Sequence, residues 1–119
     1  MPQAPLPKAV QDCHDLLAWL IPQLDKFPRT RRHTLGERIE TGLLEVLEGL
    51  VEAAYSRNKG ALLQRANLRL DMVRHLWRLS YRLEAVSHKS FEHGAGLLVE
   101  LGRQIGGWQR YSGARLGGS

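Results

Sequence analysis

The stretch from Leu62 to Val86 constrains the fold most, because it combines the longest helical pattern in the chain with its densest run of arginines. On a helical wheel at about 100° per residue, its mainly apolar side covers an arc of roughly 220°. This side consists of Leu62, Leu63, Ala66, Leu70, Met72, Val73, Leu76, Trp77, Leu79, Ser80, Tyr81 and Leu83. A helix that packs on one core needs a stripe only a little wider than about 100°. We therefore expect this helix to contact neighbours on two sides.

The polar gap of the same helix carries a ladder of arginines one turn apart, with Asp71 beside it. The ladder consists of Arg74, Arg78 and Arg82. Two more arginines, Arg65 and Arg69, fall within the apolar arc. Because an unpaired buried charge is costly, we expect these two to pair with glutamates of the preceding helix or of a neighbouring subunit.

The composition is that of a folded basic protein. With 119 residues, 43% hydrophobic and 24% charged, the chain fits one domain over residues 1–119. We expect a flexible lead-in at 1–8 and a flexible tail at 112–119, from their proline-rich and glycine-rich compositions. A formal charge of +5 suits an acidic partner such as nucleic acid, an anionic membrane or an acidic protein, and is also compatible with a merely soluble basic protein.

Cysteine content and apolar run length indicate the compartment. Cys13 is the only cysteine, which excludes an internal disulfide or a cysteine-based zinc site and suits a reducing compartment. The apolar run Leu16–Ile21 spans six residues, far fewer than the roughly 20 that cross a bilayer. We expect a cytoplasmic protein with no membrane partner.

The first helix is expected from Ala9 to Phe27, where apolar residues recur at helical spacing. Pro22 lies inside it and removes a backbone hydrogen bond, so a kink near Trp19 is expected. Pro28 disfavours helix at the residue before it and so ends this segment. A short basic connection, PRTRRH, follows.

Three further helices follow from similar patterns. The second begins at a capping box, Thr34 to Glu37, and ends near Tyr55. A turn at Ser56–Gly60 leads to the third helix, Arg57–Arg82, and a turn at Ser87–Ser90, with either serine as cap, leads to the fourth, Phe91–Tyr111. Short links between amphipathic helices predict an all-α, up-down-up-down four-helix bundle.

Charge and glycine content suggest how these helices pack. The second helix sets five glutamates against Arg38: Glu37, Glu40, Glu45, Glu48 and Glu52. The third sets seven basic residues against Asp71: Arg57, Lys59, Arg65, Arg69, Arg74, Arg78 and Arg82. These two helices should attract.

The fourth helix contains Gly94, Gly96, Gly102, Gly106 and Gly107. Each costs about 1 kcal/mol in a helix interior, which implies that neighbouring helices approach closely there.

Catalytic and metal-binding patterns are absent from the sequence. It contains no phosphate-binding glycine loop, nucleophile elbow or CxxC pair. The histidines do not form the Glu-x-x-His pattern of metal sites in helical bundles; they are His14, His33, His75, His88 and His93. We expect no enzyme activity, no metal and no cofactor.

The arginines are the candidate binding residues. Arg29, Arg31 and Arg32 in the first connection, with the ladder, have the forked guanidinium groups that bind phosphates. Arginine ladders also occur as solvated faces, and the residues alone leave both interpretations open. Among the aromatic residues, Trp77 and Trp108 suit the core. Tyr111, beside Arg110, is left as a candidate contact with a nucleobase.

Four segments in order resemble one bacterial family. They are Trp19, Leu20, Pro22 and Leu24; Lys26-Phe27-Pro28-Arg29 with Arg32, Thr34-Leu35-Gly36 and Ile39; Arg74-His75-Leu76-Trp77-Arg78; and Gly102 to Trp108, GRQIGGW. The family comprises small four-helix-bundle proteins: the accessory variability determinant (Avd) proteins of diversity-generating retroelements, and proteins encoded by intervening sequences in bacterial large-subunit ribosomal RNA genes. The last two segments are more similar to Avd.

The resemblance implies a non-catalytic protein that assembles into a homopentameric barrel. Its expected partners are the reverse transcriptase of the same element, the template RNA and the complementary DNA, and its role would be to support mutagenic reverse transcription. Arg29, Arg74, Arg78 and Arg103 match basic positions of the family pattern, whereas Arg31, Arg82 and Arg110 are added from charge geometry. The alternative is a structural protein that self-assembles or binds another protein, as for the ribosomal intervening-sequence relatives.

Overall fold

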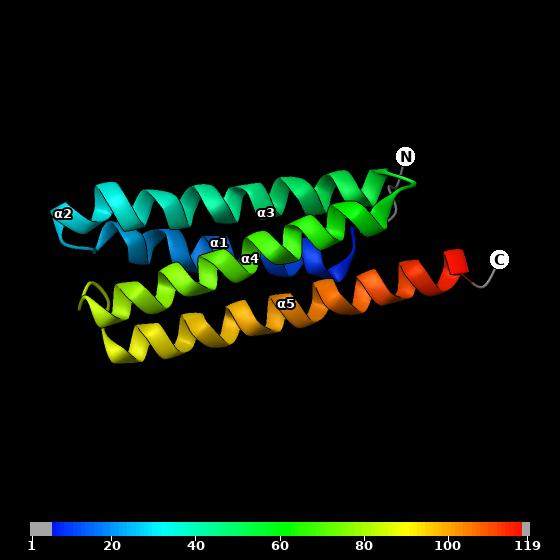
Figure 1. Cartoon of the computed structure of the whole chain (residues 1–119). Helices are drawn as coiled ribbons and strands as arrows, with labels where there is room; N and C mark the ends of the chain where they lie inside the picture. The colour runs from blue at the N-terminus through cyan, green and yellow to red at the C-terminus, as the bar shows by residue number, and fades with distance from the viewer. Residues whose placement is uncertain (1–5, 118–119) are drawn as a thin grey trace.

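Each long helix buries an apolar stripe along one side, and these stripes meet in a common core. The helices are α1 (Lys8–Asp25), α3 (Glu37–Tyr55), α4 (Lys59–Arg82) and α5 (His88–Gly117). Figure 1 shows them side by side with alternating directions. The computed structural model describes residues 6–117, with side chains as far as Gly113, and contains no strand in that range. The predicted all-α class is confirmed, and the arrangement is consistent with a four-helix bundle.

The helix rich in arginine lies between two neighbours, as its wide apolar arc predicts. α4 packs against α3 on one flank and against α5 on the other, and α1 completes the bundle by packing against α3 and α5. Part of the arc nevertheless stays uncovered. Met72 and Leu79 of the arc remain exposed, as do Leu83, just after the helix, and Leu68, which the arc does not include. These four residues, which we call the α4 apolar stripe, leave a surface that the other helices of the chain do not cover.

Trp77 of α4 joins three helices at one end of the core. It is 1% exposed, and its indole nitrogen donates a hydrogen bond of 3.0 Å to the carbonyl of Phe91 in α5. From the α1 side, the Phe27 ring stacks at 6.3 Å and the Trp19 ring packs edge-on at 6.4 Å. The core role predicted for Trp77 is therefore confirmed.

The glycines of α5 meet this core unequally. A Cβ atom built on Gly94 would lie 2.7 Å from the Trp77 ring, so close approach requires glycine there. Gly102 also faces a neighbour, with Leu70 at 3.6 Å. Gly96 has nothing within 4 Å, and Gly106 and Gly107 meet only Arg110 of the same helix, so the prediction of close helix contact is wrong at these three positions.

The first connection differs most from the prediction. Helical structure begins directly after Pro28, as α2 (Arg29–Arg31), and continues through a π-helix, η1 (Arg32–Gly36), into α3. The predicted capping box is wrong, because the residues before Glu37 are already helical and leave no free helix start to cap. The Thr34 hydroxyl instead donates to the backbone carbonyls of the preceding turn. Pro22 lies within α1 without dividing it.

A lysine caps the C-terminus of α3 at the α3–α4 turn. The Lys59 ammonium donates to the carbonyls of Ala53 and Ser56, each at 2.8 Å. A cation at this end of a helix satisfies free carbonyls and opposes the negative end of the helix dipole. α4 accordingly begins at Lys59, two residues later than the predicted Arg57.

Ser87 caps α5, as one of the two predicted alternatives. Its hydroxyl accepts a hydrogen bond of 3.2 Å from the backbone N–H of Ser90. α5 extends from His88 to Gly117, beyond both predicted ends, and the burial of Ser112 shows that packing continues past Tyr111. Residues 1–5 of the predicted lead-in and 118–119 of the predicted tail lie outside the described residues.

Gly94→Ala should destabilise the protein by about 1–3 kcal/mol, because the added methyl group overlaps the rigid Trp77 ring. Gly96→Ala is the matched control in the same helix. It should stabilise by roughly 0.5–1 kcal/mol, since alanine favours helix and the space is open. Urea denaturation followed by circular dichroism measures both. Equal free energies of unfolding in the two variants would contradict the packing described here.

Candidate nucleic-acid interface

The eight predicted arginines lie on three parts of the surface. Arg29, Arg31 and Arg32 lie on α2 and at the start of η1. Arg74, Arg78 and Arg82 follow one face of α4, and Arg103 and Arg110 lie in the second half of α5. All are exposed except Arg31, which is half-buried. In Figure 1, α2 and the last turns of α4 share one end of the bundle, whereas α5 runs toward the other end. The eight therefore do not form one cluster.

Carboxylates already pair with three of these arginines. Arg32 contacts Asp25 at 3.0 Å, Arg74 contacts Asp71 at 3.1 Å, and Arg103 contacts Glu100 at 2.7 Å. The other five make no ion pair or side-chain hydrogen bond among the residues that the structure describes: Arg29, Arg31, Arg78, Arg82 and Arg110. These five guanidinium groups are available to an outside anion.

The Arg103–Glu100 pair is the most completely hydrogen-bonded of the three. Arg103 donates to both Glu100 oxygens, through Nε at 3.0 Å and Nη2 at 2.7 Å, and Gln104 donates to one of them at 3.0 Å. These donors lower the pKa of the Glu100 carboxyl from 4.5 to about 2, with the Arg103 hydrogen bond as the largest cause. Arg103 is therefore less available to phosphate than its match to the family pattern implies.

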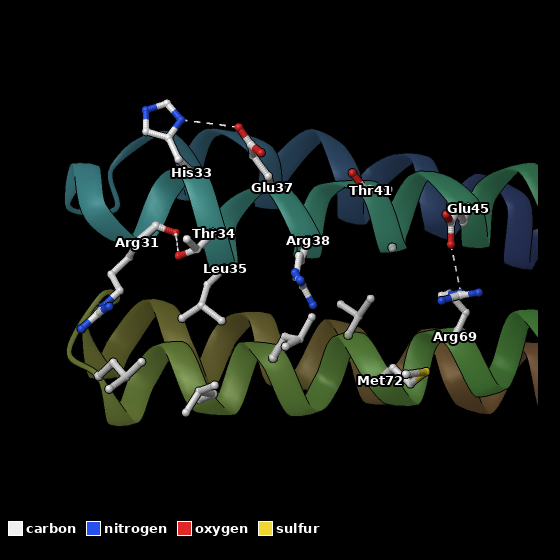
Figure 2. Close-up of a pocket in the computed structure, with 15 residues that line it drawn as sticks. Arg31, His33, Thr34, Leu35, Glu37, Arg38, Thr41, Glu45, Arg69 and Met72 are labelled. Carbon is white, nitrogen blue, oxygen red and sulfur yellow. Dashed lines mark hydrogen bonds and ion pairs between the residues drawn. The ribbon is translucent and has the colours of Figure 1, made fainter.

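A groove of about 920 Å³ lies between α3 and α4, and we call it the α3–α4 groove. Figure 2 shows Arg31, Leu35 and Arg38 pointing from α2, η1 and α3 toward α4. Met72, Leu79 and Leu83 of the α4 apolar stripe form much of the facing wall. Arg38 has no separate signal in the sequence, because its place in this groove depends on how α3 is rotated against α4.

One of the two arginines expected to pair with the second helix does so. Arg69 Nε lies 3.0 Å from Glu45 Oε2, across the α3–α4 groove (Figure 2). The pair is about half exposed, so the expectation of a buried charge is wrong. Arg65 is also exposed and lines a smaller cleft together with Glu48 and Glu52 of α3. The attraction expected between the acidic and basic helices thus acts along one flank of α4.

A second groove, of about 360 Å³, lies on the opposite flank of α4, against α5. We call it the α4–α5 groove and define it by six residues: Arg74, His75 and Arg78 of α4, and Phe91, Ala95 and Val99 of α5. The arginines of this groove were predicted from the sequence, whereas Phe91 was not predicted to line it. Its position just after the Ser87 cap was the available signal, because a side chain in the first turn of a helix lies near the bundle end.

Other chemistry receives no support from the described side chains. Burial raises the pKa of the Cys13 thiol to about 12, so it stays protonated at neutral pH. Across residues 6–117, no three or more His, Cys, Asp or Glu side chains are grouped to hold a metal ion. No helix in that part of the chain combines the length and apolarity needed to span a membrane.

One comparison with known proteins gives a match. A family model described as bAvd-like matches residues 9–112, which is most of the chain and includes all four long helices in whole or large part. No curated protein and no solved structure matches the chain.

Arg103→Ala should raise the pKa of Glu100 from about 2 toward its ordinary value of 4.5, because the largest cause of the depression is lost. The lowered pKa stabilises the fold above pH 4.5, and this stabilisation disappears as the pH falls toward 2. The variant should therefore lose less stability over that range. Carbon-13 NMR titration of the carboxyl group measures the midpoint. Gln104→Ala should give a smaller rise, and an unchanged midpoint in Arg103→Ala would contradict this assignment.

Proposed function

Because this chain belongs to the bAvd-like family, we propose that it is a non-enzymatic accessory protein of a diversity-generating retroelement. In this role it binds the reverse transcriptase of the element together with the template RNA and the complementary DNA. It supports mutagenic reverse transcription by holding these partners near one another. The choice of sequence is left to the polymerase and its template.

The observation that carries the nucleic-acid part of this proposal is the unpaired state of Arg78 and Arg82, two of the three arginines in the α4 ladder. Arg78 and Arg82 are exposed and make no ion pair among the described residues, although the chain supplies carboxylates to Arg32, Arg74 and Arg103. Guanidinium groups in this state bind phosphate oxygens through paired hydrogen bonds. Such contacts displace counterions from the nucleic acid, so the binding must weaken as salt rises.

The proposal includes a homo-oligomer, with the pentamer as the expected form. The α4 apolar stripe supports association, because Leu68 is 63% exposed and Met72 53% exposed beside two further exposed leucines. Apolar patches of this kind mark interaction surfaces. The same observation favours a second candidate function, a structural protein that only self-assembles or binds another protein. That candidate requires no affinity for RNA.

Replacing both Arg78 and Arg82 with alanine should weaken RNA binding and flatten its salt dependence. For single-stranded RNA, loss of two phosphate contacts should reduce the slope of log K against log salt by about 1.4. Fluorescence anisotropy at a series of salt concentrations gives this slope.

The matched control is Arg65→Ala with Arg69→Ala, which removes the same charge from the α3 flank of α4. It should change the slope less. If both double variants lose affinity equally, net charge alone governs binding and the ladder is not the site. Wild-type protein that binds no RNA at low salt, yet assembles, would favour the structural alternative.

Co-purification with the reverse transcriptase tests the remaining partner. If the two proteins do not co-purify, the polymerase is removed from the proposal.

Leu79→Asp should reduce the oligomer to smaller species, because it places a charge within the α4 apolar stripe. Leu44→Asp is the control on α3, where the leucine is 39% exposed, compared with 42% for Leu79. Leu44 does not line the α3–α4 groove, so its variant should assemble normally. Sedimentation velocity measures the mass of each. A wild-type monomer at all concentrations would exclude assembly.

A further inference from the structure

The α4–α5 groove has two chemically different walls. Its α4 wall carries Arg74, His75 and Arg78, and its α5 wall carries Phe91, Ala95 and Val99. Of the described residues that line it, one is a carboxylate, Asp71. The groove thus joins a cationic wall to an apolar wall over a volume of about 360 Å³.

The cationic wall can hold adjacent phosphates. Arg74 and Arg78 are one helical turn apart, about 5.4 Å along the axis. Arg78 makes no ion pair among the described residues. Arg74 is paired with Asp71, but both side chains are about half exposed, and exposed pairs of this kind contribute little. Arg74 can therefore exchange Asp71 for a phosphate at small cost.

The apolar wall presents flat and aliphatic surface. Phe91, Ala95 and Val99 are spaced four residues apart and so lie on one side of α5, over about 12 Å of helix. Val99 is 51% exposed. Apolar atoms at this position are in contact with water unless something occupies the groove.

The aromatic end of this wall is held in place by two neighbouring rings. The Phe91 ring stacks on the Tyr81 ring at 4.4 Å with an angle of 11° between the ring planes, and on Trp77 at 6.5 Å and 21°. Trp77 is buried and donates its indole hydrogen bond to the Phe91 carbonyl, whereas the Tyr81 hydroxyl lies 2.8 Å from His88 Nδ1. The Phe91 ring is therefore already ordered where it lines the groove.

We propose that the α4–α5 groove binds single-stranded nucleic acid, with phosphates on Arg74 and Arg78 and a base against the wall from Phe91 to Val99. This inference rests on the proposed nucleic-acid function and adds the strandedness of the ligand and the groove that holds it. Proteins bind single strands by combining a cationic groove with aromatic side chains on which bases stack. In a duplex, neighbouring base pairs cover the base faces, and only phosphates would reach this groove.

An acidic peptide is the competing occupant of a cationic groove. It would pair with the arginines, but its carboxylates would leave the wall from Phe91 to Val99 uncovered. The apolar wall favours a ligand that carries negative charge and a planar ring in alternation, which describes a polynucleotide. The full-length protein should therefore bind oligouridine more tightly than a duplex RNA with the same number of phosphates.

Two substitutions on the apolar wall test the inference. Phe91→Leu keeps an apolar side chain but removes the aromatic ring, and it should weaken oligouridine binding by roughly 5- to 150-fold with little change in duplex binding. Val99→Asp adds a carboxylate at an exposed position and should also weaken oligouridine binding. If Phe91→Leu does not fold, Val99→Asp tests the inference in its place. Leu44→Asp, with the same charge change on α3, should bind as wild type does. In each case fluorescence anisotropy measures affinity and circular dichroism checks folding.

The outcomes separate this inference from the proposed function. Photocrosslinking of 5-iodouridine oligonucleotides to the peptide that contains Phe91 would support the groove as the site. If oligouridine and duplex bind equally and neither wall variant changes affinity, while Arg78→Ala with Arg82→Ala weakens both, this inference fails and the proposed function stands. If the wild type binds neither RNA, both fail. If polyglutamate competes as well as oligouridine and Phe91→Leu has no effect, the groove is a site for an acidic protein.

Discussion

The packing of Trp77 against Gly94 is the contact on which the rest of the structure depends. The indole contacts the backbone of α5, stacks with Phe27 just after α1 and donates a hydrogen bond to the carbonyl of Phe91. It thereby fixes the distance between α4 and α5 and the place where the chain turns into α2. Removal of a buried tryptophan typically costs about 3–5 kcal/mol, a large share of the roughly 5–15 kcal/mol that stabilises a domain.

With that contact in place, the two flanks of α4 acquire different properties. The α3 flank has an exposed apolar stripe and the Arg69–Glu45 pair, so its charge is partly compensated. The α5 flank has Arg78 and, beyond it, Arg82, neither of which is paired within residues 6–117. A single helix therefore separates a surface suited to self-association from one suited to anions. The same rotation of α4 that buries Trp77 sets both surfaces.

The features that the sequence predicted are those set by local periodicity. The four helices, the Ser87 cap and the Arg69–Glu45 contact follow from apolar spacing, capping chemistry and opposite charges on adjacent helices. The errors arise where tertiary packing decides. Thr34 has the pattern of a cap, but packing of the segment after Pro28 extends the helix through it. In the candidate site, the arginines could be predicted as exposed. The pairing of Arg103 with Glu100 was also open to prediction, because the two residues lie three apart on one helix, whereas the place of Phe91 in the α4–α5 groove depends on how the two helices pack.

The π-helix η1 has a consequence for the positions of Arg29 and Arg31. A π-turn contains one residue more than an α-turn, and it joins α2 to α3 in one unbroken helical path from Arg29 to Tyr55. If the five residues Arg32–Gly36 wound as an α-helix instead, the preceding turn would be rotated by about 100° around the axis. Arg31, which now lines the α3–α4 groove beside Leu79 and Leu83, would then face another direction. The π-turn thus sets the direction in which Arg31 points, toward the end of α4.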